Sequence, residues 1–259
     1  MKNTWFVTGT DTGVGKTVFS LLWTRFLVER RGKVMAVKPV CSGGRDDAEA
    51  LLAVQPHVRQ IGDINPWHFQ DPVSPALAAR RMGQGVDLAA MLEFLVPLQE
   101  GSGDLIVEGA GGLLSPLGED FDNRDLLMAL GARAVVICPN RLGAINQARL
   151  VWEALPEPVR SSSSVVLNGF PVPDASTDSN EAGLARYVRG QHLFRLPQSP
   201  DPMGGPLPAV LADLHHWATR QGGNPSQSPL ANRSSRFDGL EVGNETAQGA
   251  VPGLEVWQS

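Results

Sequence analysis

Lys16 and Thr17 close a glycine-rich stretch, "GTDTGVGKT", whose residues could bind phosphate. In such a loop between a strand and a helix, consecutive backbone N–H groups bind phosphate oxygens, and the helix dipole adds attraction. The lysine would neutralise phosphate charge, and the Thr17 hydroxyl would bind Mg²⁺. The usual pattern G-x-x-x-x-G-K-[ST] would place glycine at Thr10, whereas here five residues separate Gly9 from Gly15. The Gly-Lys-Thr ending still favours a variant nucleotide-binding loop over a plain turn.

Lys38 and Glu108 are two further charged residues that could take part in chemistry. Lys38 comes near the end of the apolar run "KVMAVKP", and Glu108 ends "DLIVE". A buried strand rarely ends in a carboxylate that has no partner. The carboxyl ends of parallel strands meet at the edge of the sheet where ligands bind. Because Mg²⁺ prefers oxygen ligands, we expect Thr17 and Glu108 to share one ion.

The elements that must position these residues alternate along the chain. Nearly continuous apolar runs predict strands at 4–9, 33–39, 104–112, 133–139, 163–169 and 192–197. Helical patterns cover Lys16–Arg31, Leu88–Leu98, Leu142–Leu155 and Glu181–Arg189, the first of them ending at Gly32. Continuous rather than alternating apolar runs are typical of parallel strands covered on both faces. The sequence therefore predicts an α/β fold: a doubly wound, mostly parallel sheet with helices on both faces.

The composition suits one α/β domain of generous size. The chain has 259 residues, of which 42% are hydrophobic and 19% are charged, enough for a substantial core. A single phosphate-loop domain is predicted over 1–220. Beyond it the chain is rich in glycine, serine, asparagine, glutamine and proline without sustained periodicity, which predicts a flexible tail over 221–259. The alternative is a tail that docks through Leu240, Val242 and Trp257.

Charge, cysteine content and hydropathy narrow the class of protein. The net charge is −5 without a long basic run, which argues against nucleic acid as a partner. The two cysteines, Cys41 and Cys138, predict no disulfide framework and fit a reducing setting. The first residues lack the apolar core of a signal peptide, and no stretch approaches the length of a membrane span. We therefore expect a cytoplasmic protein whose partners are small molecules, not nucleic acid or membrane.

Several short motifs follow the loop in a distinctive order. They are "KPVCSG" (38–43), "SP" (74–75), "EGAGG" (108–112) with Pro116, "LGAIN" (142–146) and Asn168 at a strand end. Together with the loop, this order resembles the dethiobiotin synthetase family, which is P-loop NTPase-like, over about residues 4–200. The resemblance implies that ATP, as co-substrate with Mg²⁺, closes a cyclic urea on 7,8-diaminononanoate with CO₂ in biotin biosynthesis. It further implies a carbamate that attacks the γ-phosphate, giving a carbamic–phosphoric anhydride.

The resemblance also implies a role for each matching residue. Lys16 and Lys38 would be catalytic, with Lys38 contacting the carbamate and the γ-phosphate. The implied ATP contacts are Thr12, Gly13, Val14, Gly15, Lys16, Thr17, Val18, Asn168 and Pro197. The implied substrate contacts are Thr12, Ser42, Glu108, Gly109, Ala110, Gly111, Gly112, Leu142, Gly143 and Asn146. The implied metal ligands are Thr17, Glu108 and an aspartate before an alanine- and leucine-rich helix, either Asp47, which we prefer, or Asp46.

The segment "LGAIN" implies a homodimer. In the family it receives the substrate's carboxylate from the neighbouring subunit, so sites lie at the interface, and the free N–H groups of a helix start suit a carboxylate. The chain departs from the family at three positions. Gly13 stands where some members have glutamate, Gly169 where many have aspartate, and Tyr187 lies about one helical turn late. Cys41 is interpreted as a packing residue rather than a nucleophile.

Two other classes share the loop and the sheet. An amide synthase of the cobyrinic-acid type normally needs an attached glutaminase domain with a nucleophilic cysteine and a histidine, and the polar residues after 220 are not expected to supply one. A partner-regulated switch of the ParA kind usually carries an extra lysine early in its loop. Residues 10–14 contain none, and the motif "KPVCSG" also favours the synthetase.

Overall fold

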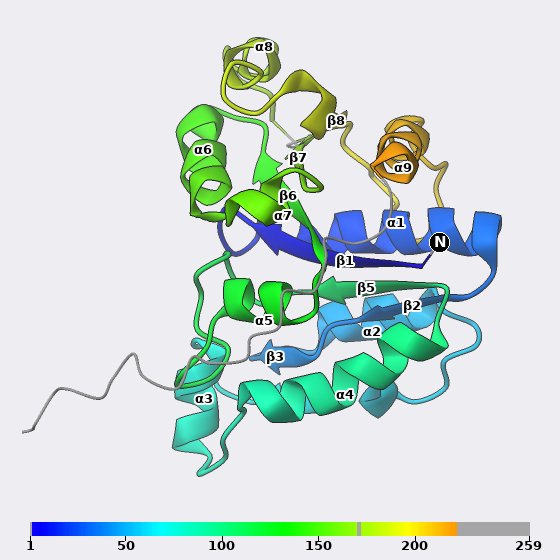
Figure 1. Cartoon of the computed structure of the whole chain (residues 1–259), viewed down its shortest axis with the longest axis vertical. Coiled ribbons are helices and arrows are strands. Elements are labelled where there is room, and N and C mark those ends of the chain that lie inside the picture. Colours follow the sequence, from blue (N-terminus) through cyan, green and yellow to red (C-terminus); the bar gives the residue numbers. More distant parts are fainter. Residues whose placement is uncertain (1, 170–171, 222–259) are drawn as a thin grey trace, which may run out of the picture. The chain divides into compact units, whose positions relative to one another are not determined.

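The computed structural model describes residues 2–169 and 172–221. Within them, the core is a six-stranded sheet in the order β2-β5-β1-β6-β7-β8 (Figure 1). Its strands are β1 (Asn3–Gly9), β2 (Val34–Val37), β5 (Asp104–Glu108), β6 (Arg133–Pro139), β7 (Ser164–Asn168) and β8 (Leu193–Leu196). Every neighbouring pair is parallel. All residues of β1, β5, β6 and β7 are buried, which explains their continuous apolar runs.

Helices cover both faces of this sheet. They are α1 (Lys16–Arg31), α2 (Asp46–Ala53), α3 (Pro75–Arg81), α4 (Leu88–Gly101), α5 (Asn123–Ala129), α6 (Ala144–Ala154), α7 (Glu157–Arg160), α8 (Asn180–Leu184) and α9 (Val210–Arg220), with 3₁₀ turns η1 (Ile61–Asp63) and η2 (Gly190–His192). From β1 the chain crosses over to β2 at one edge of the sheet. The connections from β5 to β6 and from β6 to β7 cross in the opposite direction, toward the β8 edge. Right-handed crossovers therefore place α1 opposite α5 and α6 (Figure 1). The predicted doubly wound α/β fold is confirmed.

Aromatic side chains cluster where α1 packs on the sheet. The rings of Trp5 and Trp23 meet edge to face with centroids 5.0 Å apart, and Trp23 stacks on Phe26. His215 of α9 contacts both Trp23 and Phe26, so α9 lies on the same face as α1. Among residues 2–169 and 172–221, no helix combines the length and the apolar character needed to cross a bilayer.

Two predicted elements differ from the structure. The strand predicted over 33–39 is shorter in the structure, because β2 ends at Val37 and Pro39 has no N–H with which to continue the ladder. The chain then forms β3 (Val40–Ser42), which pairs with β4 (Trp67–Phe69) in a separate two-stranded sheet. The helix predicted over Glu181–Arg189 is wrong in length.

The helix in that region, α8, ends at Leu184. Gly183 lowers its helix propensity, and the next turn is tight because Tyr187 N–H donates to Leu184 O, three residues back. The other strands and helices predicted from the sequence are present, most with ends shifted by a few residues. The tail predicted over 221–259 lies, apart from Gln221, outside the described residues.

The strand order brings distant polar residues to one edge of the sheet. In the β1–β5 pairing, Val7 lies opposite Glu108. The phosphate loop begins two residues after Val7, at Gly9. In the β2–β5 pairing, Val37 lies opposite Val107. Lys38 therefore leaves its strand beside Glu108, at the carboxyl edge where ligands bind in α/β sheets.

Candidate active site

The phosphate loop is held by its glycines and by Asn168. Gly13 and Gly15 have φ of 71° and 93°, in the left-handed region that favours glycine. A Cβ on Gly15 would lie 2.1 Å from Asn168 Nδ2. That amide nitrogen donates to Val14 O over 3.0 Å. The end of β7 thus fixes the loop from the side opposite Glu108.

Lys16 is a buried ammonium at the first turn of α1. Its Nζ donates to Asp11 O over 2.9 Å, so the side chain curls back along its own loop. Burial, followed by repulsion from Lys38, lowers the pKa of Lys16 to about 8. The charged form is therefore less favoured than in a solvent-exposed lysine, and an anion in the loop would stabilise it.

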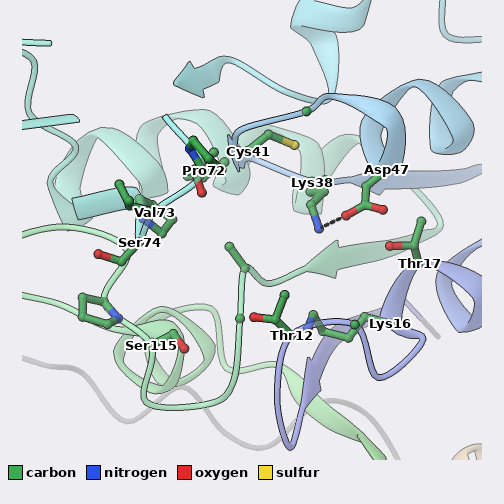
Figure 2. A pocket seen from close by; sticks show the side chains of 18 of the residues that line it. Thr12, Lys16, Thr17, Lys38, Cys41, Asp47, Pro72, Val73, Ser74 and Ser115 are labelled. Carbon is green, nitrogen blue, oxygen red and sulfur yellow. Dashed lines mark ion pairs between the residues drawn. The ribbon is translucent and has the colours of Figure 1, made fainter. Parts of the chain in front are cut away.

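Lys38 lies between two carboxylates. Its Nζ lies 2.7 Å from Glu108 Oε1 and 2.9 Å from Asp47 Oδ2, the second contact being the dashed line in Figure 2. Burial works to lower the pKa of Lys38, but Glu108 and Asp47 outweigh it and raise the pKa above its usual value. Burial likewise opposes the charge of Asp47, yet Lys38 holds the pKa of Asp47 below its usual value. Lys38 is consequently a cation and not a base at neutral pH.

The oxygen atoms around Glu108 fit a magnesium ion. Thr17 Oγ1 donates to Glu108 Oε1 over 2.8 Å, while Glu108 Oε2 is buried and has no hydrogen-bond partner among the described residues. A buried carboxylate oxygen without a partner is costly. Within the part of the chain described, no group of three or more histidine, cysteine or acidic residues is arranged so that it could hold a metal ion by itself. Two carboxylates and a hydroxyl match an ion that keeps waters and binds phosphates rather than one held in a closed protein cage.

A cavity of about 710 Å³ joins the loop to these charged groups (Figure 2). The predicted site residues among its lining are Thr12, Gly13, Gly15, Lys16, Thr17, Val18, Lys38, Ser42, Asp47, Ala110 and Gly111. Val14 and Glu108 are buried beneath it. Asp46 is exposed and does not line the cavity, whereas Asp47 does.

The far wall of the cavity is apolar with scattered hydroxyls. Cys41 and Val73 are apolar groups there, and Ser74 and Ser115 add hydroxyls (Figure 2). Burial raises the pKa of the Cys41 thiol to about 11. A thiolate is therefore scarce at neutral pH, which supports the interpretation of Cys41 as a packing residue.

Asn123 orders the glycine-rich segment after β5. Its Nδ2 lies within hydrogen-bonding distance of the carbonyls of Ala110, Gly112 and Ser115, at 2.8–3.1 Å. A Cβ on Gly109 would lie 2.4 Å from Asn123 Oδ1, so glycine is required there. The sequence interpretation missed Asn123, which follows the N-cap Asp122 of α5 and carries no charge or periodic pattern that marks it as functional.

Some predicted site residues lie away from this cavity. Pro197 lines a second cavity of about 340 Å³ at the ends of β7 and β8, together with Gly169. A Cβ on Gly169 would lie 2.3 Å from the backbone nitrogen of Gln198, which explains why glycine stands at this position. Asn168 contacts the loop through Val14, and the next residue, Gly169, lines this second cavity.

The segment at the start of α6 is also separate from the main cavity. Leu142, Gly143 and Asn146 do not belong to the lining found for it. The expectation of free N–H groups there is wrong for Leu142 and Ala144, whose N–H groups donate to Asp174 Oδ2 over 2.6 Å and to Arg141 O over 3.0 Å. Leu142 itself is 76% exposed.

A family model and two curated relatives match most of this chain. A family model described as an AAA domain matches residues 3–204. ATP-dependent dethiobiotin synthetase BioD of Anaeromyxobacter sp. (strain K) is 37% identical over 201 residues, which cover 76% of this chain and 90% of that protein. The protein of the same name from Ralstonia nicotianae is 33% identical over 205 residues, with the same coverage.

Among solved structures, the MinD cell division protein of Aquifex aeolicus aligns with a TM-score of 0.51 and 13% identity, over 84% of this chain and 96% of that one. Identity this low shows a shared fold and nothing about activity. The named relatives, by contrast, exceed 30% identity over nine tenths of their own length. The chain belongs to the dethiobiotin synthetase family.

Proposed function

We propose that this chain uses ATP to close the cyclic urea of dethiobiotin on 7,8-diaminononanoate with CO₂, releasing ADP and phosphate. The observation that carries the proposal is the position of Lys38. It is a cation fixed by Glu108 and Asp47 on the wall of a cavity that begins at the phosphate loop. Phosphoryl transfer depends mainly on positioning and charge neutralisation, which such a cation supplies.

The nucleotide phosphates would lie on the backbone N–H groups of the loop, from Thr12 to Thr17. Lys16 would leave Asp11 O and bind the β- and γ-phosphates, whose negative charge would stabilise the ammonium form that burial disfavours. Thr17, Glu108 and Asp47 would hold Mg²⁺, which would offset the negative charge of the phosphates. We assign the base to the second cavity, near Asn168 and Pro197.

Lys38 would act on the groups that react. One amine of the substrate takes up CO₂ and loses a proton, forming a carbamate. A carbamate oxygen then attacks the γ-phosphorus, the bond to ADP breaks, and a carbamic–phosphoric anhydride results. An ammonium has three N–H donors, so Lys38 would keep its contact with Glu108 and release Asp47 to Mg²⁺ in order to donate to both the carbamate oxygen and a γ-phosphate oxygen. The second amine attacks the carbonyl carbon, loses a proton and expels phosphate, which closes the ring.

The diamine would occupy the wall opposite the loop. Its alkyl chain matches the apolar groups of Cys41 and Val73, and its amines match the hydroxyls of Ser42 and Thr12. The carbonyl and N–H groups of the Gly109–Gly112 segment, fixed by Asn123, would face the reacting end. An apolar wall with few polar groups is typical of sites that orient a flexible small molecule.

The carboxylate tail would extend toward a neighbouring subunit. Leu142, Gly143 and Asn146 are the residues assigned to it, and they do not line the cavity of their own chain. Leu142 and Leu150 leave apolar side chains 76% and 65% exposed at α6. A homodimer that covers this surface would bring the segment to the partner's cavity. We place this dimer in the cytoplasm, where the reduced cysteines are stable.

The test is the dependence of ATP turnover on the other substrates. ADP formation is measured with MgATP alone, then with bicarbonate, with 7,8-diaminononanoate and with both. We expect substantial turnover only when both are present, because no acceptor for the γ-phosphate exists without the carbamate. ADP formation that is equally fast without the diamine would overturn the proposal.

A further inference from the structure

The backbone of Lys38 leaves the main sheet and needs a separate support. β2 ends at Val37, and Pro39 restricts Lys38 to an extended conformation. Lys38 N–H donates to Ile64 O over 3.0 Å, and Trp67 N–H donates to Pro39 O over 3.1 Å. The dipeptide that carries the reactive ammonium therefore lies against the segment 64–67 instead of a strand of the sheet.

We infer that Asn65, supported by Arg45, is a positioning residue that sets where Lys38 stands. The Asn65 side chain is fully buried. Its Nδ2 donates to Lys38 O over 2.7 Å and lies 3.3 Å from the carbonyls of Pro39 and Trp67. The shortest of these contacts is the one to Lys38. The carbonyl of Lys38, at the point where the sheet ends, thus has a side-chain partner in place of a strand partner.

Arg45 fixes which way the Asn65 amide points. Arg45 Nε donates to Asn65 Oδ1 over 2.8 Å, and Arg45 Nη2 donates to Asn65 O over 2.9 Å. A guanidinium can only donate, so the amide oxygen must face Arg45 and the NH₂ group must face the carbonyls. Rotation of the amide would bring two donors together and is excluded.

The same contact connects Lys38 to the helix that carries Asp47. Arg45 is the N-cap residue of α2, and Asp47 is the second residue of that helix. Asn65 therefore joins the backbone of one member of the Lys38–Asp47 ion pair to the residue that begins the helix of the other. This connection limits how far the two residues can move apart and so lowers the entropy lost when they form the 2.9 Å ion pair.

Gln55 provides a matched control for this role. It is also a fully buried amide. It accepts from Ala36 N–H over 2.7 Å and donates to Ala36 O over 2.9 Å. It supports β2 two residues before Lys38 and makes no hydrogen bond to Lys38. A variant that loses this amide should lose stability without moving the ammonium.

The inference rests on the proposed role of Lys38, and the experiment separates the two. Steady-state rates with the diamine, bicarbonate and MgATP are compared for the wild type, Asn65→Ala, Gln55→Ala, Lys38→Gln and Lys38→Gln combined with Asn65→Ala. Binding of a non-hydrolysable ATP analogue is measured for each, at a temperature where circular dichroism shows the variant folded.

We expect Asn65→Ala to lower kcat about 10²-fold, the loss that a displacement of about 1 Å can cause. Its affinity for the ATP analogue should stay within about threefold of the wild type, because the phosphate loop is unaffected. Gln55→Ala should keep kcat within about twofold. In the Lys38→Gln background, Asn65→Ala should cost little more, because residues that act through one group are not additive.

Two outcomes would overturn the inference while leaving the proposed function intact. One is a kcat for Asn65→Ala no lower than that of Gln55→Ala. The other is a further full loss in the Lys38→Gln background. Wild-type turnover by Lys38→Gln itself would instead refute the catalytic role proposed for Lys38, on which the inference rests.

If Asn65→Ala does not fold, Arg45→Ala tests the same connection, because Arg45 is only partly buried and holds the Asn65 amide. The kcat of Arg45→Ala should fall on the order of tenfold with affinity for the ATP analogue retained. An unchanged kcat would refute the inference.

Discussion

Lys38 Nζ and Glu108 Oε1 lie 2.7 Å apart although 70 residues separate them in the chain. Their strands, β2 and β5, are neighbours, and the pairing of Val37 with Val107 places the next residue of each strand side by side. The parallel register therefore creates the ion pair at the edge of the sheet. It is also what keeps Lys38 charged, so the fold sets the chemistry that this residue can perform.

Lys38→Gln should lose on the order of 10²-fold in kcat, the scale of removing one preorganised charge-stabilising donor. Its affinity for a non-hydrolysable ATP analogue should remain within a few-fold, because the charge matters most during transfer. Product formation paired with isothermal titration measures both quantities. A loss confined to analogue affinity would contradict this role.

Lys16→Gln should behave differently. Lys16 belongs to the loop and would contact the phosphates before and during transfer, so both analogue affinity and kcat should fall. The same pair of measurements applies. Equal analogue affinity in Lys16→Gln and the wild type would show that the loop lysine does not bind the nucleotide.

Glu108→Gln and Asp47→Asn should each weaken metal binding on the order of tenfold or more. The readout is binding of Mn²⁺, as a substitute for Mg²⁺, to the complex with the ATP analogue, followed by electron paramagnetic resonance. Asp46→Asn is the control, since Asp46 is exposed and does not line the cavity. A larger effect from Asp46→Asn than from Asp47→Asn would assign the ligand to Asp46.

Nucleotide binding should take up a proton above about pH 8. Burial and Lys38 lower the pKa of Lys16 to about 8 in the nucleotide-free protein, and bound phosphates favour the charged form. Analogue affinity should therefore fall as the pH rises past 8. Between about pH 8 and the usual lysine pKa of 10.5, the unfolded chain binds more protons at this residue, so its contribution to the free energy of unfolding rises with pH.

Titration calorimetry at pH 8.5 in two buffers of different ionisation enthalpy measures this uptake. Lys16→Arg is the control, because a guanidinium stays charged and should take up no proton. Equal apparent enthalpies in both buffers for the wild type would show that Lys16 is already protonated, contrary to the lowered pKa.

Mixing two inactive variants tests the shared site. Lys38→Gln damages the cavity, and Asn146→Ala damages the segment offered to the partner. If both halves form one site, a mixed dimer contains one intact site, and random reassociation should restore about a quarter of the wild-type activity. The matched mixture of Lys38→Gln with Lys16→Gln should restore none, because both changes lie in the same half. Lack of recovery in the first mixture, with dimers confirmed by light scattering, would refute the shared-site proposal.

Part of the fold and of the site could be predicted because some sequence patterns mark the ends of helices and strands directly. The helix Lys16–Arg31 was predicted with its observed ends, since a glycine-rich loop precedes it and Gly32 follows it. The end of β5 at Glu108 placed a carboxylate among apolar residues, which is a strong signal. The ends of this helix and the carboxylate at the end of β5 can be recognised from adjacent residues alone, without tertiary contacts.

The residues that the sequence did not reveal act through the backbone. Asn65 and Asn123 bind main-chain carbonyls that only the folded chain brings together. Nothing in their local sequence distinguishes them from surface asparagines. β3 and β4 have three residues each, too few for a periodic pattern. The helix Val210–Arg220 was missed although Leu211, Leu214 and Trp217 repeat at helical spacing.

The most direct test of the synthetase activity is mass detection of the product formed from 7,8-diaminononanoate, ¹³C-bicarbonate and MgATP. The wild type should give dethiobiotin that carries one ¹³C atom, with one ADP formed for each product molecule, while Lys38→Gln gives it on the order of 10²-fold more slowly. ADP formation without labelled dethiobiotin, or no reaction from a folded protein that binds the ATP analogue, would contradict the proposed function.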